Sequence, residues 1–475
     1  MTSDPLVCVV LAAGKGTRMK SRRPKVLHEV AGRPMLGQVL ASLEALGPQR
    51  IVVVIGPDMD EVAAAAQPHS CVVQQEQLGT GHAVLAAREA LGEALGDALG
   101  EALAQDSRDA SVLVVFGDTP LITVETLQRL VAARAAEPAP ALVALAFRAA
   151  DPGPYGRLLL DETGRLTGVV EAVDADAAQR RIDLCNAGVL LAGRKILFEL
   201  LAKVGNDNAK GEYYLPDVYR LACEAGLHGT VVEASEAEVL GVNTQAELAV
   251  AEAEMQTRLR AAAMAGGVTL SDPAAVWLSH DTELAPGVLV EPNVVFGTGV
   301  SVGEGARIRA FSHLEGARIA AGAEVGPFAR LRPGANLAER AKVGNFVEVK
   351  NALLGAGAKA NHLTYLGDAK IGPGANIGAG TITCNYDGFG KSPTEVGPGA
   401  FIGSNTALIA PVKIGAGAVI GAGSTVTRDV PDDAVAIERS AQRNLEGAAK
   451  RYRELRQKAG QKAGKAGKAP KDKES

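Results

Sequence analysis

Aliphatic residues recur with a six-residue period in the C-terminal part of the chain. Small residues follow most of them, as in the stretch Ile-Gly-Ala-Gly-Ala-Val. The periodic positions are Ile371, Ile377, Val396, Ile402, Leu408, Ile414, Ile420 and Val426. A strict short period predicts a solenoid, because each hexad supplies one inward side chain and forms one face of a triangular coil. Stacked coils of three hexads would bury one continuous aliphatic column.

The same period continues upstream, with a slip of one residue near its middle. The upstream positions are Leu278, Leu284, Val290, Phe296, Val302, Ile308, Leu314, Ile319, Val325, Leu331, Leu337, Val343 and Val349. We therefore expect a left-handed parallel β-helix of hexapeptide repeats over residues 267–437.

The N-terminal part has a different pattern, in which short apolar runs alternate with helical periods. The expected strands are Val7–Leu11, Ile51–Ile55, Ser111–Phe116 and Leu142–Phe147. This alternation predicts an α/β Rossmann-like domain with a parallel sheet over residues 1–243. Residues 244–264 are rich in Ala, Glu, Leu and Arg without Gly or Pro, which predicts a long helix within a linker over 244–266.

Two segments are biased in composition. The stretch Leu91–Gln105 repeats Ala-Leu-Gly, and we interpret it as a helical extension without chemistry. Residues 438–475 are expected to form a C-terminal helix followed by a disordered tail, because 457–475 are mostly Lys, Ala and Gly.

Composition narrows the class of protein. A chain of 475 residues is too long for one ordinary domain, so two or three are expected. Apolar runs are too short for a membrane-spanning helix, so membrane insertion is not expected. Five scattered cysteines without a C-x-x-C pair favour a cytoplasmic protein without a zinc site. The net charge of −5 argues against nucleic acid as a partner.

A glycine-rich loop directly follows the first expected strand. It begins with Leu11, Ala12, Ala13 and Gly14 and continues to Met19. Two glycines let the backbone approach a phosphate closely, and the amides can bind its oxygen atoms. Lys15, Arg18 and Lys25 add cations to the same segment. The loop matches neither a Walker A motif nor a G-x-G-x-x-G fingerprint, so its specificity lies in the whole string through Pro24-Lys25.

This string resembles the nucleotidyltransferases that couple a sugar 1-phosphate to a nucleoside triphosphate. Their glycine-rich loop ends in an arginine and precedes a Pro-Lys pair. The segments Gln74–Ala83 and Phe116-Gly117-Asp118 resemble the family's base-binding segment and its metal-binding strand end. Tyr155-Gly156-Arg157 and Gly241-Val242-Asn243 are similar to the sugar contacts and the second metal ligand.

The resemblance implies a role for each matching residue. Asp118 and Asn243 would hold Mg²⁺, while Arg18 and Lys25 would neutralise the phosphates of UTP. The base and nucleotide contacts would come from Gln74, Gly79, Thr80 and Phe116. Gly156, Glu171 and Asn186 would bind the hydroxyl and N-acetyl groups of N-acetylglucosamine 1-phosphate. The sequence departs from the family at Phe116, where a tyrosine is expected, and at Ala187, where a threonine is expected.

The β-helix pattern is interrupted at two polar segments. A loop from Cys384 to Lys391 is inserted between hexads, and His362–Asp368 places polar and aromatic residues inside an aliphatic repeat. Loops that leave a solenoid often carry its function. Arg332, Lys350 and Lys391 add cations, which predicts a site for an anionic substrate.

These strings resemble the acetyltransferase half of the bifunctional bacterial enzymes that acetylate glucosamine 1-phosphate and then uridylylate the product. The similar motifs are Gly344–Lys350, His362–Asp368 and Ile382–Gly388, and the resemblance covers nearly the whole chain in the same order. It implies a homotrimeric, cytoplasmic enzyme that makes UDP-N-acetylglucosamine, a precursor of bacterial cell-wall polymers.

In this interpretation His362 is the general base, since imidazole titrates near neutral pH, and Glu348 is the candidate acceptor that orients it. The amide of Tyr386 would stabilise the oxyanion. Arg332, Lys350 and Lys391 suit the sugar phosphate, and Tyr365 and Asn376 would contact the sugar. The resemblance places acetyl-CoA along Ala379, Asn385, Tyr386, Ser404, Ala422 and Arg439.

Simpler interpretations remain for single residues and for the whole chain. An Asp at a strand end is usually a cap, His82 is more often structural than catalytic, and Cys384 is best interpreted as an inert thiol, since nothing in the sequence lowers its pKa. A pyrophosphorylase with a purely structural β-helix is one alternative function. A non-enzymatic assembly scaffold is another.

Overall fold

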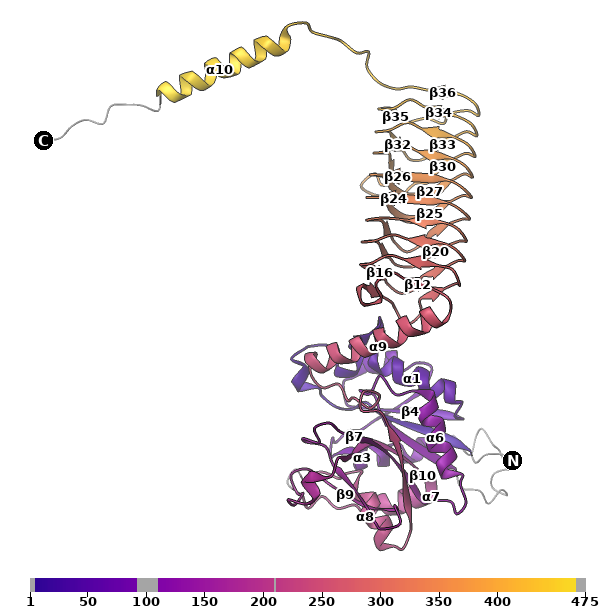
Figure 1. The fold of residues 1–475 in the computed structure, drawn as a ribbon, viewed down its shortest axis with the longest axis vertical. Helices are drawn as coiled ribbons and strands as arrows, with labels where there is room; N and C mark the ends of the chain where they lie inside the picture. Colours follow the sequence, from indigo (N-terminus) through magenta and orange to yellow (C-terminus); the bar gives the residue numbers. More distant parts are fainter. Residues whose placement is uncertain (1–4, 92–109, 209–210, 467–475) are drawn as a thin grey trace, which may run out of the picture. The chain divides into compact units, whose positions relative to one another are not determined.

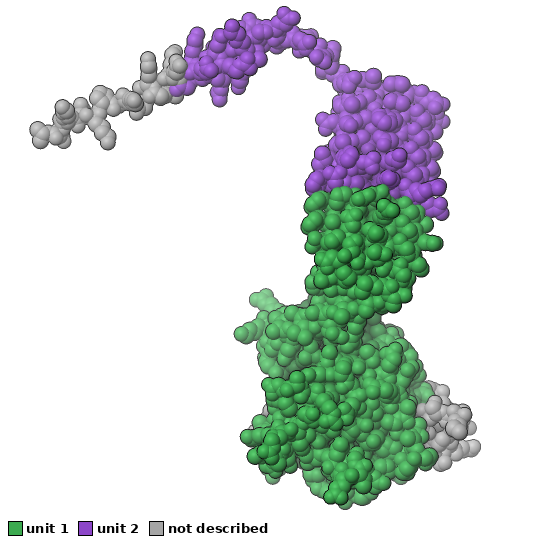
Figure 2. Space-filling view, viewed as in Figure 1, with its two compact units in different colours: residues 1–335 green, residues 336–475 purple. Residues whose placement is uncertain are grey.

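The structure is a computed structural model that describes residues 5–91, 110–208 and 211–466. The chain separates into two compact units, residues 1–335 and 336–475 (Figure 2). The predicted division into four segments stays a prediction, because the two units are separated by the contacts within each of them and their boundary falls inside the β-helix. The stretch Leu91–Gln105 lies, apart from Leu91 itself, outside the described residues.

The first unit contains a nine-stranded sheet with both parallel and antiparallel pairings. In spatial order its strands are β5 (Ser70–Val73), β4 (Arg50–Ile55), β1 (Leu6–Leu11), β6 (Ser111–Phe116), β10 (Leu184–Gly193), β7 (Leu142–Arg148), β11 (Gly229–Ala234), β9 (Leu166–Val170) and β8 (Arg157–Leu160). Strands β4, β1 and β6 are parallel, as predicted, and β5, which was not among the expected strands, pairs parallel with β4. Strand β10 runs antiparallel between β6 and β7, which the sequence pattern did not predict.

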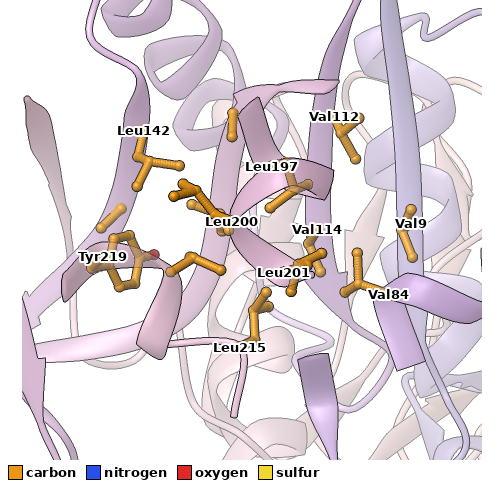
Figure 3. Close-up of a cluster of buried hydrophobic side chains, with 14 of the residues drawn as sticks. Val9, Val84, Val112, Val114, Leu142, Leu197, Leu200, Leu201, Leu215 and Tyr219 are labelled. Carbon is orange, nitrogen blue, oxygen red and sulfur yellow. The ribbon is translucent and has the colours of Figure 1, made fainter. Parts of the chain in front are cut away.

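Helices cover both faces of this sheet (Figure 1). Helices α3 (Thr80–Ala86), α7 (Arg194–Leu201) and α8 (Asp217–Glu224) pack on the face that carries Val9 and Val114. Helices α1 (Met35–Leu46), α2 (Asp60–Ala65) and α6 (Val124–Arg134) pack on the opposite face. Figure 3 shows part of the first of these cores, in which aliphatic side chains from α7 meet the sheet. Burial on both faces explains why β1, β4, β6 and β7 are continuously apolar and not alternating.

The first unit also contains several short elements. They are η1 (Thr17–Met19), η2 (Lys25–Leu27), η3 (Gln179–Arg181), η4 (Pro273–Ala275) and the strand pair β2 (Glu29–Val30) and β3 (Arg33–Pro34). The predicted long helix is confirmed as α9 (Gln245–Ala265). Its N-cap Thr244 accepts a hydrogen bond from the Glu247 amide at 3.2 Å, the start signal of a Thr-x-x-Glu sequence.

The hexad pattern forms the predicted parallel β-helix. In the first unit its strands are β12 (Thr269–Leu270), β13 (Val276–Trp277), β14 (Glu283–Leu284), β15 (Leu289–Val290), β16 (Val294–Phe296), β17 (Ser301–Val302), β18 (Arg307–Ile308), β19 (His313–Leu314), β20 (Ala317–Ile319), β21 (Glu324–Val325) and β22 (Arg330–Leu331), with β23 (Ala335–Leu337) at the border between the units. Leu289 pairs with Arg307, three hexads further along, so one coil is three hexads long.

The second unit continues with strands of the same kind. They are β24 (Lys342–Asn345), β25 (Glu348–Leu354), β26 (Lys359–His362), β27 (Tyr365–Ile371), β28 (Asn376–Ile377), β29 (Ile382–Cys384), β30 (Thr394–Val396), β31 (Phe401–Ile402), β32 (Ala407–Ile409), β33 (Val412–Ile414), β34 (Val419–Ile420), β35 (Thr425–Val426) and β36 (Val435–Ala436). Of all the predicted hexad positions in both units, only Leu284 is not fully buried. The column of inward aliphatic side chains is therefore confirmed.

The C-terminal helix is longer than predicted. Helix α10 spans Ala448–Ala466 and so includes residues from the segment expected to be disordered. Ala and Lys are strong helix formers, and the two glycines in this stretch do not end the helix. Residues 467–475 lie outside the described part of the chain.

Candidate active sites

A cavity of about 370 Å³ lies at the carboxyl end of β1 and β6 in the first unit. This size suits a small-molecule ligand. The predicted residues that line it are Leu11, Ala12, Ala13, Gly14, Lys25, Gln74, Gly79, Thr80, Phe116, Asp118 and Asn243. Residues far apart in the sequence thus meet at the position where parallel α/β sheets usually bind ligands.

Three side chains converge at one end of this cavity. The Lys25 ammonium donates to Asp118 Oδ2 and, at 3.0 Å, to Asn243 Oδ1. A backbone hydrogen bond of 2.9 Å from Val242 to the Asp118 carbonyl holds the two acceptors together. The backbone of Asn243 is also fixed by the start of α9, because its backbone amide donates a hydrogen bond of 2.7 Å to Glu247 Oε2.

The oxygen atoms of Asp118 and Asn243 are ligands of the kind that a hard cation such as Mg²⁺ prefers. Asp118 and Asn243 direct one carboxylate oxygen and one amide oxygen at a single cationic group, Lys25. Mg²⁺ is typically held by one or two protein oxygens together with phosphates and water. The residues therefore fit such an ion. The described residues, this site included, hold no cluster of three or more His, Cys, Asp or Glu side chains suited to a metal.

Gly16 determines how closely the loop approaches Lys25. Its backbone has a φ of +61°, and a Cβ added there would stand 2.5 Å from the Cβ of Lys25. Only glycine satisfies both the left-handed conformation and this approach. Arg18 follows on η1 with an exposed side chain and does not line the cavity, so its predicted role stays a prediction.

The base-binding segment is held by its own side chains. Gln74 is buried, and its Nε2 contacts the Gly79 carbonyl and His82 Nδ1, both at 3.1 Å. His82 therefore orients Gln74, which agrees with the structural interpretation of this histidine. A Cβ on Gly79 would lie 2.7 Å from the Tyr213 carbonyl, so no side chain fits there.

The predicted sugar contacts form a cluster of their own. The Asn186 amide donates to the Gly156 carbonyl at 2.8 Å, and a Cβ on Gly156 would stand 3.3 Å from Glu171 Oε1. None of the three lines the cavity described above. The pairing of β8 with β10 brings Gly156 and Asn186 together, and the pairing of β8 with β9 adds Glu171.

Four cavity-lining residues were missed by the sequence analysis: Val26, Gln77, Ala83 and Glu212. Gln77 donates from Nε2 to the Ala13 carbonyl and so ties the base-binding segment to the glycine-rich loop. It lies within the Gln74–Ala83 string, but no pattern distinguished it from its neighbours. Glu212 lies far from every motif in the sequence and had no signal.

In the second unit, His362 lies at the exposed end of β26. Its Nδ1 is 2.6 Å from Asn345 Oδ1. The predicted acceptor was Glu348, and the structure differs here. The reason is strand register, because Asn345 pairs with His362 whereas Glu348 pairs with Tyr365 on the neighbouring face.

Asp368 connects the remaining predicted groups of this site. It accepts hydrogen bonds from the side chains of Asn351 and Asn385. Burial alone would raise the pKa of the Asp368 carboxyl, but these two hydrogen bonds and the charges of Lys391 and Lys350 lower it below its usual value. Both lysines therefore lie near the same carboxylate. Arg332 belongs to the first unit, so its part in the phosphate-binding set stays a prediction.

Tyr365 and Asn385 meet above Gly367. A Cβ on Gly367 would lie 2.3 Å from the Tyr365 hydroxyl oxygen and 2.8 Å from Asn385 Nδ2. The inserted loop forms a tight hairpin, in which the backbones of Tyr386 and Lys391 form an antiparallel β-bridge. Phe389, at the tip, is 98% exposed. Burial raises the pKa of the Cys384 thiol, which fits the interpretation of an inert residue.

Three of the six predicted acetyl-CoA residues, Ala379, Ser404 and Ala422, follow one edge of the β-helix. Asn405 donates to the Ala379 carbonyl at 2.7 Å, Gly423 donates to the Ser404 carbonyl at 2.8 Å, and Arg439 donates to the Ala422 carbonyl at 2.7 Å. Ala379, Ser404 and Ala422 therefore occupy equivalent positions in successive coils. Asn376 is half-buried on β28, between Lys359 and Phe401 of the adjacent coils.

Comparison with known proteins places these sites in a family. The family model for the MobA-like NTP transferase domain matches residues 8–183. The model for the bacterial transferase hexapeptide (six repeats) matches residues 393–428. The bifunctional protein GlmU of Paramagnetospirillum magneticum is 53% identical over 465 residues, which cover 98% of this chain and 100% of the relative.

The chain belongs to the family of bifunctional GlmU proteins. Its GlmU relative from Sphingopyxis alaskensis is 52% identical over 96% of this chain and 98% of the relative, and that from Azorhizobium caulinodans is 53% identical over 96% and 99%. The protein is accordingly a bifunctional transferase, with a nucleotidyltransferase domain followed by a hexapeptide acyltransferase domain.

The chain is also similar to solved structures, among them that of UDP-glucose pyrophosphorylase complexed with UDP-glucose. It is 16% identical, covers 54% of this chain and 99% of its own, and has a TM-score of 0.42. A similarity this weak carries no argument. Within the described residues, no helix is both long and apolar enough to span a bilayer.

Proposed function

We propose that the chain makes UDP-N-acetylglucosamine in two steps. An acetyl group passes from acetyl-CoA to glucosamine 1-phosphate, and the uridylyl group of UTP then passes to N-acetylglucosamine 1-phosphate with release of pyrophosphate. The observation that carries the proposal is the presence, in one GlmU-family chain, of a cavity where Asp118 and Asn243 converge and of a separate oriented imidazole at His362.

Uridylyl transfer requires positioning and neutralisation of charge more than covalent chemistry. A sugar phosphate oxygen attacks the α-phosphorus of UTP, a P–O bond forms, and pyrophosphate leaves with the electron pair of the broken bond. Asp118 and Asn243 would hold Mg²⁺, which would offset the negative charge of the phosphates. Lys25 and Arg18 would neutralise the remaining phosphate charge.

Recognition in this domain would divide between two regions. Gln74 and the backbone at Gly79 and Thr80 would read uracil through hydrogen bonds, since the Gln74 amide is already held in place by His82. Gly156, Glu171 and Asn186 would bind the sugar. Phe116 packs its ring against Gly188, where a Cβ would stand 2.7 Å from the ring, so this residue can offer only an apolar surface.

Acetyl transfer would use the second unit. The neutral amine of glucosamine 1-phosphate attacks the thioester carbon, a C–N bond forms, and the C–S bond breaks. His362 would accept the proton from the amine and return it to the departing CoA thiolate. The Tyr386 amide would stabilise the oxyanion, while Lys350 and Lys391 would bind the sugar phosphate.

Acetyl-CoA would lie along the edge formed by Ala379, Ser404 and Ala422, with Arg439 at its end. Support comes from the equivalent placement of the three residues in successive coils. Tyr365 and Asn376 would contact the sugar beside this edge. Because both reactions use soluble phosphorylated substrates, the proposed location is the cytoplasm.

We further propose a homotrimer. Phe401, Val419 and Val435 lie in register on the outer face of β31, β34 and β36, with exposed fractions of 49%, 39% and 68%. Such an apolar stripe is typical of a surface that packs against another subunit. Sedimentation equilibrium should give about three times the chain mass of 48.8 kDa, and a mass equal to one chain would contradict the proposal.

The experiment that tests the function measures both products. Purified protein with acetyl-CoA and glucosamine 1-phosphate should release CoA thiol, and protein with UTP and N-acetylglucosamine 1-phosphate should release pyrophosphate. Chelation of divalent cations should abolish only the second reaction. Absence of CoA release would favour the pyrophosphorylase with a structural β-helix, and absence of both products would favour the scaffold.

A further inference from the structure

The general base of the proposed acetyl transfer has a neutral partner. His362 ends β26 and Asn345 ends β24, and the two residues face each other in the parallel ladder. The 2.6 Å contact joins His362 Nδ1 to the amide oxygen of Asn345. An amide oxygen only accepts hydrogen bonds, so Nδ1 must carry the proton.

The backbone around His362 is fixed from the same side. The Leu363 amide donates to the Asn345 carbonyl at 3.0 Å, and the Thr364 hydroxyl donates to the His362 carbonyl at 2.8 Å. Leu363 has a φ of +50°, at a corner where the next coil has Gly380 with a φ of +75°. A leucine in this conformation is strained, so the surrounding contacts hold the corner in place.

Geometry therefore fixes both the tautomer and the direction of the ring. We propose that Asn345 is a positioning residue for acetyl transfer, which keeps the proton on His362 Nδ1 and leaves Nε2 free to accept the proton of the sugar amine. The inference deepens the proposed acetyl transfer and rests on it. Asn345 itself does not touch the reacting atoms.

The neutral character of Asn345 is part of the inference. A carboxylate in its place would also orient the ring, but its charge would favour the imidazolium, which cannot accept a proton. An amide orients the ring without this effect. The enzyme would then keep its base in the reactive form without requiring a high pH.

Two substitutions separate orientation from charge. Asn345→Ala removes the acceptor and should lower kcat for acetyl transfer by roughly tenfold to a hundredfold, the loss usual for partners that orient a functional imidazole. Asn345→Asp keeps the shape and should retain more activity than Asn345→Ala at high pH. Its acid limb in the pH profile of kcat/KM should move upward by roughly one pH unit or more.

The control is Asn336→Asp, which adds the same charge at an exposed position of the same β-helix. Its profile should superpose on that of the unmodified protein, since the substrate amine titrates identically in every variant. Thermal unfolding of each variant checks that the fold is kept.

The positioning role is overturned if Asn345→Ala keeps kcat within twofold, or if the Asn345→Asp profile does not move. His362→Ala distinguishes this failure from failure of the proposed function. If His362→Ala loses acetyl transfer while Asn345→Ala does not, only the positioning role is wrong. If His362→Ala retains full acetyl transfer, the proposed base itself is wrong.

Discussion

At the scale of single residues, close backbone approach explains much of the chemistry. Gly16 allows the glycine-rich loop to lie against Lys25, and Lys25 in turn lies between Asp118 and Asn243. Gly16 can therefore control the position of Lys25, the residue proposed to bind the phosphates. The same holds in the second unit, where Gly367 lies beneath Tyr365 and Asn385.

Gly16→Ala should reduce kcat/KM for uridylyl transfer by roughly tenfold or more, because a Cβ at 2.5 Å from Lys25 must displace it and a misplaced catalytic group is costly. Steady-state pyrophosphate release measures the effect. Gly205→Ala is the matched control, since nothing lies within 4 Å of its Cβ position. Equal activity of Gly16→Ala and Gly205→Ala would show that the loop does not position Lys25.

Asp368 predicts a pH-dependent contribution to stability. Its pKa is lowered in the folded protein, so its stabilisation is present above the pKa of the unfolded chain and disappears as the pH falls through the folded value. Asp368→Asn should therefore lower the free energy of unfolding at pH 7, and the difference from the unmodified protein should shrink below about pH 4. Denaturant titrations at both pH values check this, and a difference independent of pH would contradict it.

At the scale of elements, the β-helix could be predicted from the hexad pattern, because one inward aliphatic side chain in every six residues defines both the strand and its buried face. The apolar runs of β1, β4, β6 and β7 were predicted for a similar reason. The antiparallel direction of β10 was not predicted, since the apolar pattern of a strand does not reveal in which direction the strand runs. Pairing between distant strands decides that direction.

Stability should follow the inward and outward alternation of each coil. Ile308→Ala should lower the free energy of unfolding by about 2–5 kcal/mol, because Ile308 is fully buried in the column. Arg307→Ala, on the outer face of the same strand, should change it by less than about 0.5 kcal/mol. Urea titration compares the two, and similar losses would contradict the assigned inner face.

Candidate site residues were predictable where a motif fixes the backbone, as in the loop from Leu11 to Gly14. Partners chosen by register were not predictable. Asn345 instead of Glu348 contacts His362 because strand pairing places Asn345 opposite it, and sequence distance alone does not reveal the pairing. Gln77 and Glu212 also line the cavity at β1 and β6, and they were not predicted because the tertiary fold, which the sequence pattern does not show, brings them there.

At the scale of the whole molecule, each compact unit carries one of the two proposed reactions. The Asp118 and Asn243 site lies in residues 1–335, and His362 lies in residues 336–475. No described residue serves both sites in the proposed mechanism. Loss of one reaction should therefore leave the rate of the other unchanged.

The most direct test is to measure both activities of His362→Ala in one preparation. Release of CoA thiol from acetyl-CoA and glucosamine 1-phosphate should fall by a factor of roughly 10² or more, since removal of a general base costs about this much. Release of pyrophosphate from UTP and N-acetylglucosamine 1-phosphate should stay at the rate of the unmodified protein. Undiminished thiol release, or equal loss of both products, would contradict the account.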